Sequence, residues 1–149
     1  MPLGIDLQLV LPRDNATVPL VRHILQSTLT EFGVRADCVG DVLLAVTEAS
    51  ANVIEHSAGD DEYEVKVSVD EQRCEIRVID AHNGFDPAVA DGFPGSEAER
   101  GRGLLLMQAL MDGLEFESEP ETGMVVRLTK DLAFDVAPLT RARKVEPPT

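Results

Sequence analysis

The stretch LLAVTEASANVIEHS, residues 43–57, decides the fold and also raises the question of function. Its apolar residues, among them Val46 and Val53, recur at the spacing of a helix that buries one face. At about 100° per residue, Glu48 and Asn52 fall together on the opposite face. The pattern therefore predicts a helix whose apolar stripe covers a sheet while a carboxylate and an amide share the other side.

Two interpretations of this polar face remain open. The simpler one is a solvated surface, and His56, near the expected helix end, fits a surface or capping residue better than a ligand or base. The other is a binding or catalytic site. Glu48 could take a proton or orient a nucleophile. Asn52 could offer a neutral oxygen to a hard cation such as Mg²⁺.

The rest of the chain predicts an α/β domain of the α+β kind. Alternating apolar residues predict strands near 5–11, 65–69, 74–80, 114–118 and 124–130. Helical spacing predicts helices near 14–32, 36–57 and 102–111, with Asp14, Asn15 or Thr17 as N-cap and Gly33 as stop. This order favours a mixed, largely antiparallel sheet with helices on one face.

Composition narrows the class of protein. The 149 residues suit one domain, and their net charge of −14 disfavours binding to nucleic acid or anionic lipid. A basic protein partner fits this charge better, although solubility alone also explains it. Cys38 and Cys74 are expected to be small core residues. No leader or long apolar run is apparent, which predicts a cytoplasmic protein without a membrane span.

Two stretches with glycines stand downstream of the polar helix. VIDAHNGFDP, residues 78–87, places Asp80 at a strand end before the turn at Gly84. GRGLLLMQALMD, residues 101–112, places two glycines directly before a predicted helix, where backbone N–H groups could receive phosphate. Each stretch alone also fits an ordinary turn or loop.

Taken in order, TEASANVIEHS, GFDP and GRGLLLMQALMD resemble the GHKL ATPase superfamily, and within it the small bacterial anti-sigma factor serine/threonine kinases. The resemblance implies the Bergerat ATP-binding fold, a two-layer α/β sandwich, as a single domain over residues 1–132. It implies a mobile lid at 85–100. Residues 133–149, rich in proline and charge, are expected to form a disordered tail.

The resemblance also implies roles for individual residues. Glu48 would be the base that activates the attacking hydroxyl, and Asn52 would coordinate the Mg²⁺ of bound ATP. Asp80 would accept a hydrogen bond from the adenine amino group, and Gly84 would let the base pack against the turn. The phosphates and the rest of the cofactor would lie by four consecutive residues, Gly101, Arg102, Gly103 and Leu104.

The function implied is transfer of the γ-phosphoryl group of ATP to a serine or threonine of an anti-sigma factor antagonist, a STAS-type protein. The same protein would bind a sigma factor directly, and homodimerisation is suggested by the family. Two positions depart from the family pattern: His82 stands for a glycine and Met124 for a threonine. The alternative is therefore a nucleotide-binding or partner-binding module of this fold that sequesters a regulator without kinase activity. A third reading is an unrelated α/β scaffold in which the motifs occur by chance.

Overall fold

The structure, a computed structural model, describes residues 3–55, 62–80, 97–119 and 123–135 of the chain. Its elements follow in the order β1 (Ile5–Pro12), α1 (Thr17–Glu31), α2 (Ala36–Glu55), β2 (Glu62–Val69), β3 (Arg73–Asp80), α3 (Glu97–Leu110), β4 (Gly113–Glu119) and β5 (Gly123–Asp131). The predicted order of strands and helices is therefore confirmed.

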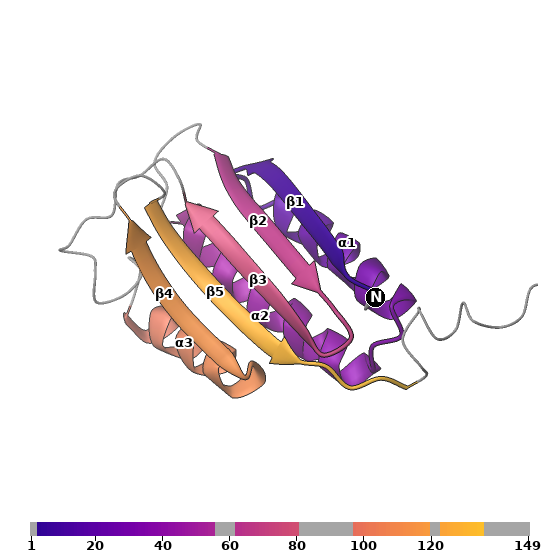
Figure 1. Cartoon of the computed structure of the whole chain (residues 1–149). Coiled ribbons are helices and arrows are strands. Elements are labelled where there is room, and N and C mark those ends of the chain that lie inside the picture. The colour runs from indigo at the N-terminus through magenta and orange to yellow at the C-terminus, as the bar shows by residue number, and fades with distance from the viewer. Residues whose placement is uncertain (1–2, 56–61, 81–96, 120–122, 136–149) are drawn as a thin grey trace, which may run out of the picture.

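The strands form one five-stranded sheet in the order β1-β2-β3-β5-β4. Every strand pair in the described part of the chain is antiparallel, so the sheet is simpler than the mixed arrangement the sequence suggested. Figure 1 shows α1 and α2 side by side behind the sheet and α3 at the edge formed by β4. The result is a two-layer sandwich in which the described helices cover one face of the sheet.

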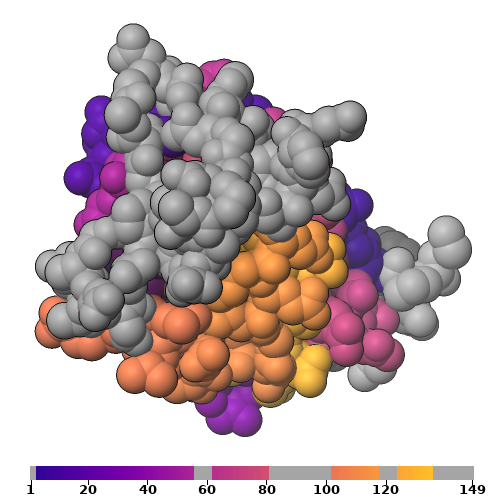
Figure 2. Space-filling view, turned by 90° about the vertical axis from the view of Figure 1, so that its left-hand side faces the viewer, coloured from indigo at the N-terminus to yellow at the C-terminus, as the bar shows by residue number. Residues whose placement is uncertain are grey.

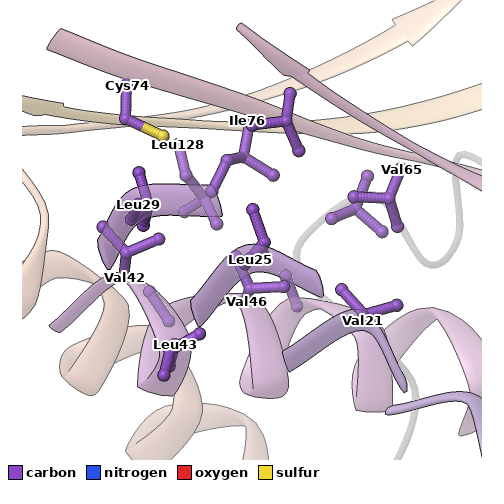
Figure 3. Packing of buried hydrophobic residues seen from close by; sticks show 14 of the residues in the cluster. Val21, Leu25, Leu29, Val42, Leu43, Val46, Val65, Cys74, Ile76 and Leu128 are labelled. Atoms are coloured by element: carbon purple, nitrogen blue, oxygen red, sulfur yellow. The ribbon is translucent and has the colours of Figure 1, made fainter. Parts of the chain in front are cut away.

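The core lies between the sheet and the two long helices. Burial alternates along β2 and β3, as expected for strands covered on one side. Figure 3 shows residues of α1 and α2 directed towards the inner face of the sheet. The completely buried side chains on the two sides of this interface include Val21, Leu25, Leu29, Val42 and Val46 from the helices and Val65, Cys74, Ile76 and Leu128 from the strands. Burying an aliphatic side chain of this size contributes about 1.5–3 kcal/mol, so this interface is the main source of stability.

Few of the described polar groups lie in this core, and burial changes the pKa values of two of them. The Tyr63 hydroxyl and Thr17 Oγ1 are 2.7 Å apart in a buried hydrogen bond, and burial raises the pKa of Tyr63. Burial raises the pKa of the Cys74 thiol to about 12, so it stays protonated and unreactive near neutral pH. Cys38 and Cys74 are both buried and not disulfide-bonded, which confirms them as core residues.

The sequence prediction is wrong for the start of α1 and correct for its end. The N-cap is Ala16, without a side-chain cap, and so none of the three predicted candidates holds that position. Asp14 instead accepts a hydrogen bond from the Ala16 N–H through its Oδ1, at 2.9 Å. This bond is an Asx turn that leads the chain into the helix.

The predicted stop at Gly33 is confirmed. Gly33 has φ 95°, and its N–H donates to Thr30 O at 3.0 Å while the Val34 N–H donates to Leu29 O at 3.1 Å. This pair of bonds is a Schellman motif, which needs a left-handed residue at the position of Gly33. The turn directs the chain back so that α2 can lie beside α1.

Packing continues beyond Leu132, the last residue of the domain predicted from the sequence. The Phe134 ring lies 6.2 Å from the Phe32 ring, and Phe134 pairs with Val34 in an isolated bridge. The rest of the predicted tail, 136–149, and the lid up to residue 96 lie outside the described residues. Among the helices that the structure describes, none has the length and apolarity needed to cross a membrane.

Two glycine substitutions should change stability in opposite directions. Gly33→Ala should lower the free energy of unfolding by about 1 kcal/mol or more, because alanine is strained at positive φ. Gly40→Ala should raise it by about 0.5–1 kcal/mol, because Gly40 is helical and a Cβ there meets nothing within 4 Å. Urea unfolding of both variants measures the difference. Equal effects of the two substitutions would contradict the assigned conformation of Gly33.

Candidate functional site

The direction of α2 decides which residues can meet. The Arg35 N–H donates to Ala133 O at 2.8 Å, so α2 begins beside the chain that leaves the end of β5. Because α2 runs back across the sheet, its C-terminal half lies where β5 begins and β3 ends, with Asp80 paired to Met124. Asn52 and Asp80 are thereby brought to the same end of the sandwich.

The two faces predicted for α2 are present. The apolar stripe is completely buried: Val42, Val46, Ala49 and Val53. On the other side Glu48 is half-buried, whereas Glu55, at the helix end, is exposed. Asn52 is only 9% exposed, so a solvated surface does not describe its position. His56 lies outside the described residues.

Helix α3 closes over this polar face through Gly103. A Cβ at Gly103 would lie 2.9 Å from Glu48 Oε2 and 3.9 Å from Asn52 Nδ2. A Cβ here would crowd the end of the Glu48 side chain and push the carboxylate aside, so glycine leaves Glu48 undisturbed at this close approach. Met107 and Met111 continue the same buried stripe at helical spacing and pack α3 in place. Glu48 and Asn52 from one predicted motif and Gly103 from another are thus neighbours.

The Asn52 amide carries the main signal for a ligand. Its Nδ2 is buried and has no hydrogen-bond partner among the described residues. A buried polar group without a partner costs about 1–3 kcal/mol, which evolution tolerates where a ligand supplies the partner. A half-turn about the terminal side-chain bond exchanges Nδ2 for Oδ1, an oxygen of the kind that Mg²⁺ prefers.

The residues present fit a magnesium nucleotide better than a metal held by protein alone. Within the described ranges, no group of three His, Cys, Asp or Glu side chains could hold a metal ion. In nucleotide sites Mg²⁺ takes most of its ligands from phosphates and water, so one or two protein oxygens suffice. Asn52 can supply one such oxygen, and Glu48 lies one turn away on the same helix.

The start of α3 corrects one prediction. The helix begins at Glu97 and not near Arg102, so Gly101 and Gly103 lie inside it and not before it. Only about the first four N–H groups of a helix are free, and Gly101 comes after them. The expected phosphate contact through the free helix N-terminus therefore does not apply to Gly101–Gly103. The two glycines interrupt the apolar pattern of the helix. The pattern alone therefore predicts a start later than the observed one at Glu97.

The side chains around Gly103 differ in exposure. Arg102 is exposed and Leu104 is half-buried. Figure 2 shows α3 and β4 together on one side of the molecule, where α3 contributes to the surface. A role of these residues at the phosphates stays a prediction, as does that of Gly84, which lies outside the described residues together with His82.

Asp80 is at the predicted strand end, but it has a partner that the sequence did not reveal. It is 4% exposed, and Arg13 Nη2 donates a hydrogen bond to its Oδ1 in an ion pair. The Arg13 side chain is fully buried. The two residues are 67 positions apart, so no local spacing could have signalled the pair. The half-buried Met124 lies on the strand beside Asp80.

Comparison with known proteins agrees with this arrangement. Residues 11–130 match the histidine kinase-like ATPase domain. The chain belongs to the histidine kinase-like ATPase family. Within this family it is similar to proteins named serine-protein kinase RsbW, and the resemblance to the small bacterial anti-sigma factor kinases is confirmed.

Three relatives illustrate the similarity. The serine-protein kinase RsbW of Bacillus velezensis is 30% identical, over 89% of this chain and 89% of its own. That of Bacillus subtilis is 28% identical, over 85% of each chain. An anti-sigma F factor of Thermoanaerobacter pseudethanolicus is 34% identical, over 65% of this chain and 73% of its own. Such coverage makes a chance occurrence of the three motifs untenable.

A solved structure supports the fold independently. The crystal structure of the RsbU and RsbW domains of a Mycobacterium tuberculosis protein matches with a TM-score of 0.67 and 19% identity. The match covers 91% of this chain and 34% of that longer chain. The histidine kinase-like ATPase fold predicted from the motifs is therefore confirmed.

The buried ion pair at this site should be important for stability. Arg13→Met should lower the free energy of unfolding by about 3–5 kcal/mol, because it leaves the Asp80 carboxylate buried without its guanidinium. Arg35→Met is the matched control, since the Arg35 side chain is 50% exposed in its ion pairs and should contribute less than about 1 kcal/mol. Urea unfolding of both variants tests this. Equal losses would show that the Arg13 pair is not buried in solution.

Proposed function

We propose that this protein is a Mg²⁺- and ATP-dependent protein serine/threonine kinase that also acts as an anti-sigma factor. It transfers the γ-phosphoryl group of ATP to a serine or threonine of a STAS-type anti-sigma factor antagonist, and it binds a sigma factor directly. The names of its relatives, serine-protein kinase RsbW and anti-sigma F factor, support both halves of this proposal.

One observation in the structure supports the proposed kinase activity. Asn52 is buried with an amide nitrogen that lacks a partner in the described chain, one turn from Glu48 and against Gly103. A purely structural helix face would place an apolar residue at such a position, because an unsatisfied amide destabilises the folded protein. A metal-bound nucleotide would give the amide its partner, and Glu48 would then act on the hydroxyl that attacks the nucleotide.

Each residue of the site would have its own role in phosphoryl transfer. This reaction depends on positioning and charge stabilisation more than on covalent chemistry by the protein. Asn52 would hold the Mg²⁺ that, when bound, neutralises charge on the phosphates. Glu48, half-buried, would accept the proton of the attacking hydroxyl. Asp80 would accept a hydrogen bond from the adenine amino group, and Gly84, Gly101, Arg102, Gly103 and Leu104 complete the nucleotide site.

The partners follow from the same proposal. Phosphorylation adds negative charge to the antagonist, and this chain already carries a net charge of −14, so the phosphorylated antagonist would be repelled and released. The kinase would then be free for a sigma factor, whose basic surface suits an acidic partner. We propose that these reactions take place in the cytoplasm, where sigma factors act, and that the protein forms a homodimer.

Phosphotransfer from Mg-ATP to a candidate antagonist tests the proposal. Glu48→Gln should lower the rate by about 10²–10⁴-fold, because the base is lost, while ATP and sigma-factor binding remain. Glu55→Gln is the matched control: it makes the same change on the same helix, but Glu55 is exposed at the helix end. The control variant should keep the wild-type rate.

Other outcomes discriminate among the candidate functions. Full activity of Glu48→Gln would remove Glu48 from the chemistry. Tight sigma-factor binding by a wild-type protein that transfers no phosphate would favour the alternative, a partner-binding module of this fold without kinase activity.

A further inference from the structure

Arg13 is a buried, charged residue that has no role in the proposed function. It follows β1 directly after Pro12, in the short segment that leads to α1. Its side chain is fully buried, and Nη2 donates to Oδ1 of Asp80 at the end of β3. Since β2 lies between β1 and β3, Arg13 reaches past a whole strand to make this contact.

The sheet register makes this reach possible. Pro12 is paired with Glu62 at the start of β2, and Glu64 is paired with Ile79 at the end of β3. The end of β1, the start of β2 and the end of β3 therefore lie together at one end of the sandwich. An arginine that follows β1 at this end is within reach of the Asp80 carboxylate.

The guanidinium determines the chemical form of Asp80. A carboxyl group in an apolar site tends to hold its proton, and it can then donate as well as accept hydrogen bonds. Arginine is always charged, so a contact with it favours the ionised carboxylate, which only accepts.

We propose that Arg13 determines the base specificity of the nucleotide site by holding Asp80 in its acceptor-only form. This inference rests on the proposed function, in which Asp80 meets the exocyclic group of the base. An acceptor-only carboxylate binds a purine with an exocyclic amino group, such as adenine, and repels the exocyclic carbonyl of hypoxanthine or guanine. Arg13 is thus a positioning residue that acts through Asp80 and does not itself touch the nucleotide.

Alternative tasks for Arg13 predict different behaviour. If it only stabilised the fold, its loss would weaken binding of every nucleotide equally. If it competed with the base for Asp80, its loss would strengthen binding. Only a specificity role changes the ratio of affinities for two nucleotides that differ in the exocyclic group.

Calorimetric titration with Mg-ATP and Mg-ITP tests the proposal. ITP carries an exocyclic carbonyl where ATP carries the amino group, with the ring nitrogen beside it protonated. Wild-type protein should bind ATP more tightly than ITP. Arg13→Gln, which keeps hydrogen-bonding capacity without charge, should lower this preference by about tenfold or more, whereas Arg13→Lys should preserve it. The ratio is insensitive to partial unfolding, because both nucleotides bind the same folded fraction.

Two further variants complete the design. In an Asp80→Asn background, Arg13→Gln should leave the ratio unchanged, because the residue through which Arg13 acts no longer titrates. Arg35→Met, which removes an exposed guanidinium about 25 Å from Asn52 by the rise of α2, should behave as wild type. If Arg13→Gln does not fold, Arg13→Lys is compared with Asp80→Asn. Arg13→Lys keeps the charge and should keep the wild-type ratio, and a ratio that falls as far as it does in Asp80→Asn would overturn the specificity role.

The outcomes separate failure of this inference from failure of the proposed function. An unchanged ratio in Arg13→Gln, or equally tighter binding of both nucleotides, overturns the specificity role and leaves the kinase proposal intact. Wild-type protein that binds neither nucleotide overturns the proposed function, and this inference with it.

Discussion

The fold and the site both depend on α2, which must satisfy two environments at once. Its apolar stripe is buried against the sheet and α1, and this burial stabilises the core. Its other face presents Glu48 and Asn52 to α3. The apolar contacts fix the rotation of the helix about its axis, so the same packing that stabilises the fold also aims the functional side chains.

Helix α3 adds the second constraint. It lies close to α2 at Gly103, where the missing side chain leaves Glu48 Oε2 undisturbed. At its other end, Lys130 donates to the Leu110 carbonyl at 2.6 Å and to Asp41 at 3.1 Å, which joins the C-terminus of α3 to both β5 and α2. A cation at this helix end also interacts favourably with the helix dipole. The site is thus held by elements that are fixed at some distance from it.

The sequence predicted the features that depend on local pattern. The two faces of α2, the alternating strands and the left-handed turn at Gly33 follow from periodicity and from the conformational freedom of glycine. Motif order predicted that Glu48, Asn52 and Gly103 belong to one site, although only the fold makes them neighbours. The start of α3 was misplaced because glycines inside a helix resemble a loop in sequence. The Arg13–Asp80 pair was missed because it depends on strand register between distant segments, which no local pattern encodes.

The central claim is that Asn52 is kept buried and unsatisfied by the protein for the sake of a magnesium nucleotide. Thermal unfolding of Asn52→Leu with and without Mg-ATP tests it most directly, since leucine has a similar volume and no polar atom. The account predicts that the variant melts at a higher temperature than wild type without ligand, because a buried amide that lacks a partner among the described residues is removed. It also predicts that Mg-ATP raises the melting temperature of the wild type and not of the variant. A variant that melts lower without ligand, or that is stabilised by Mg-ATP as much as the wild type, would contradict the account.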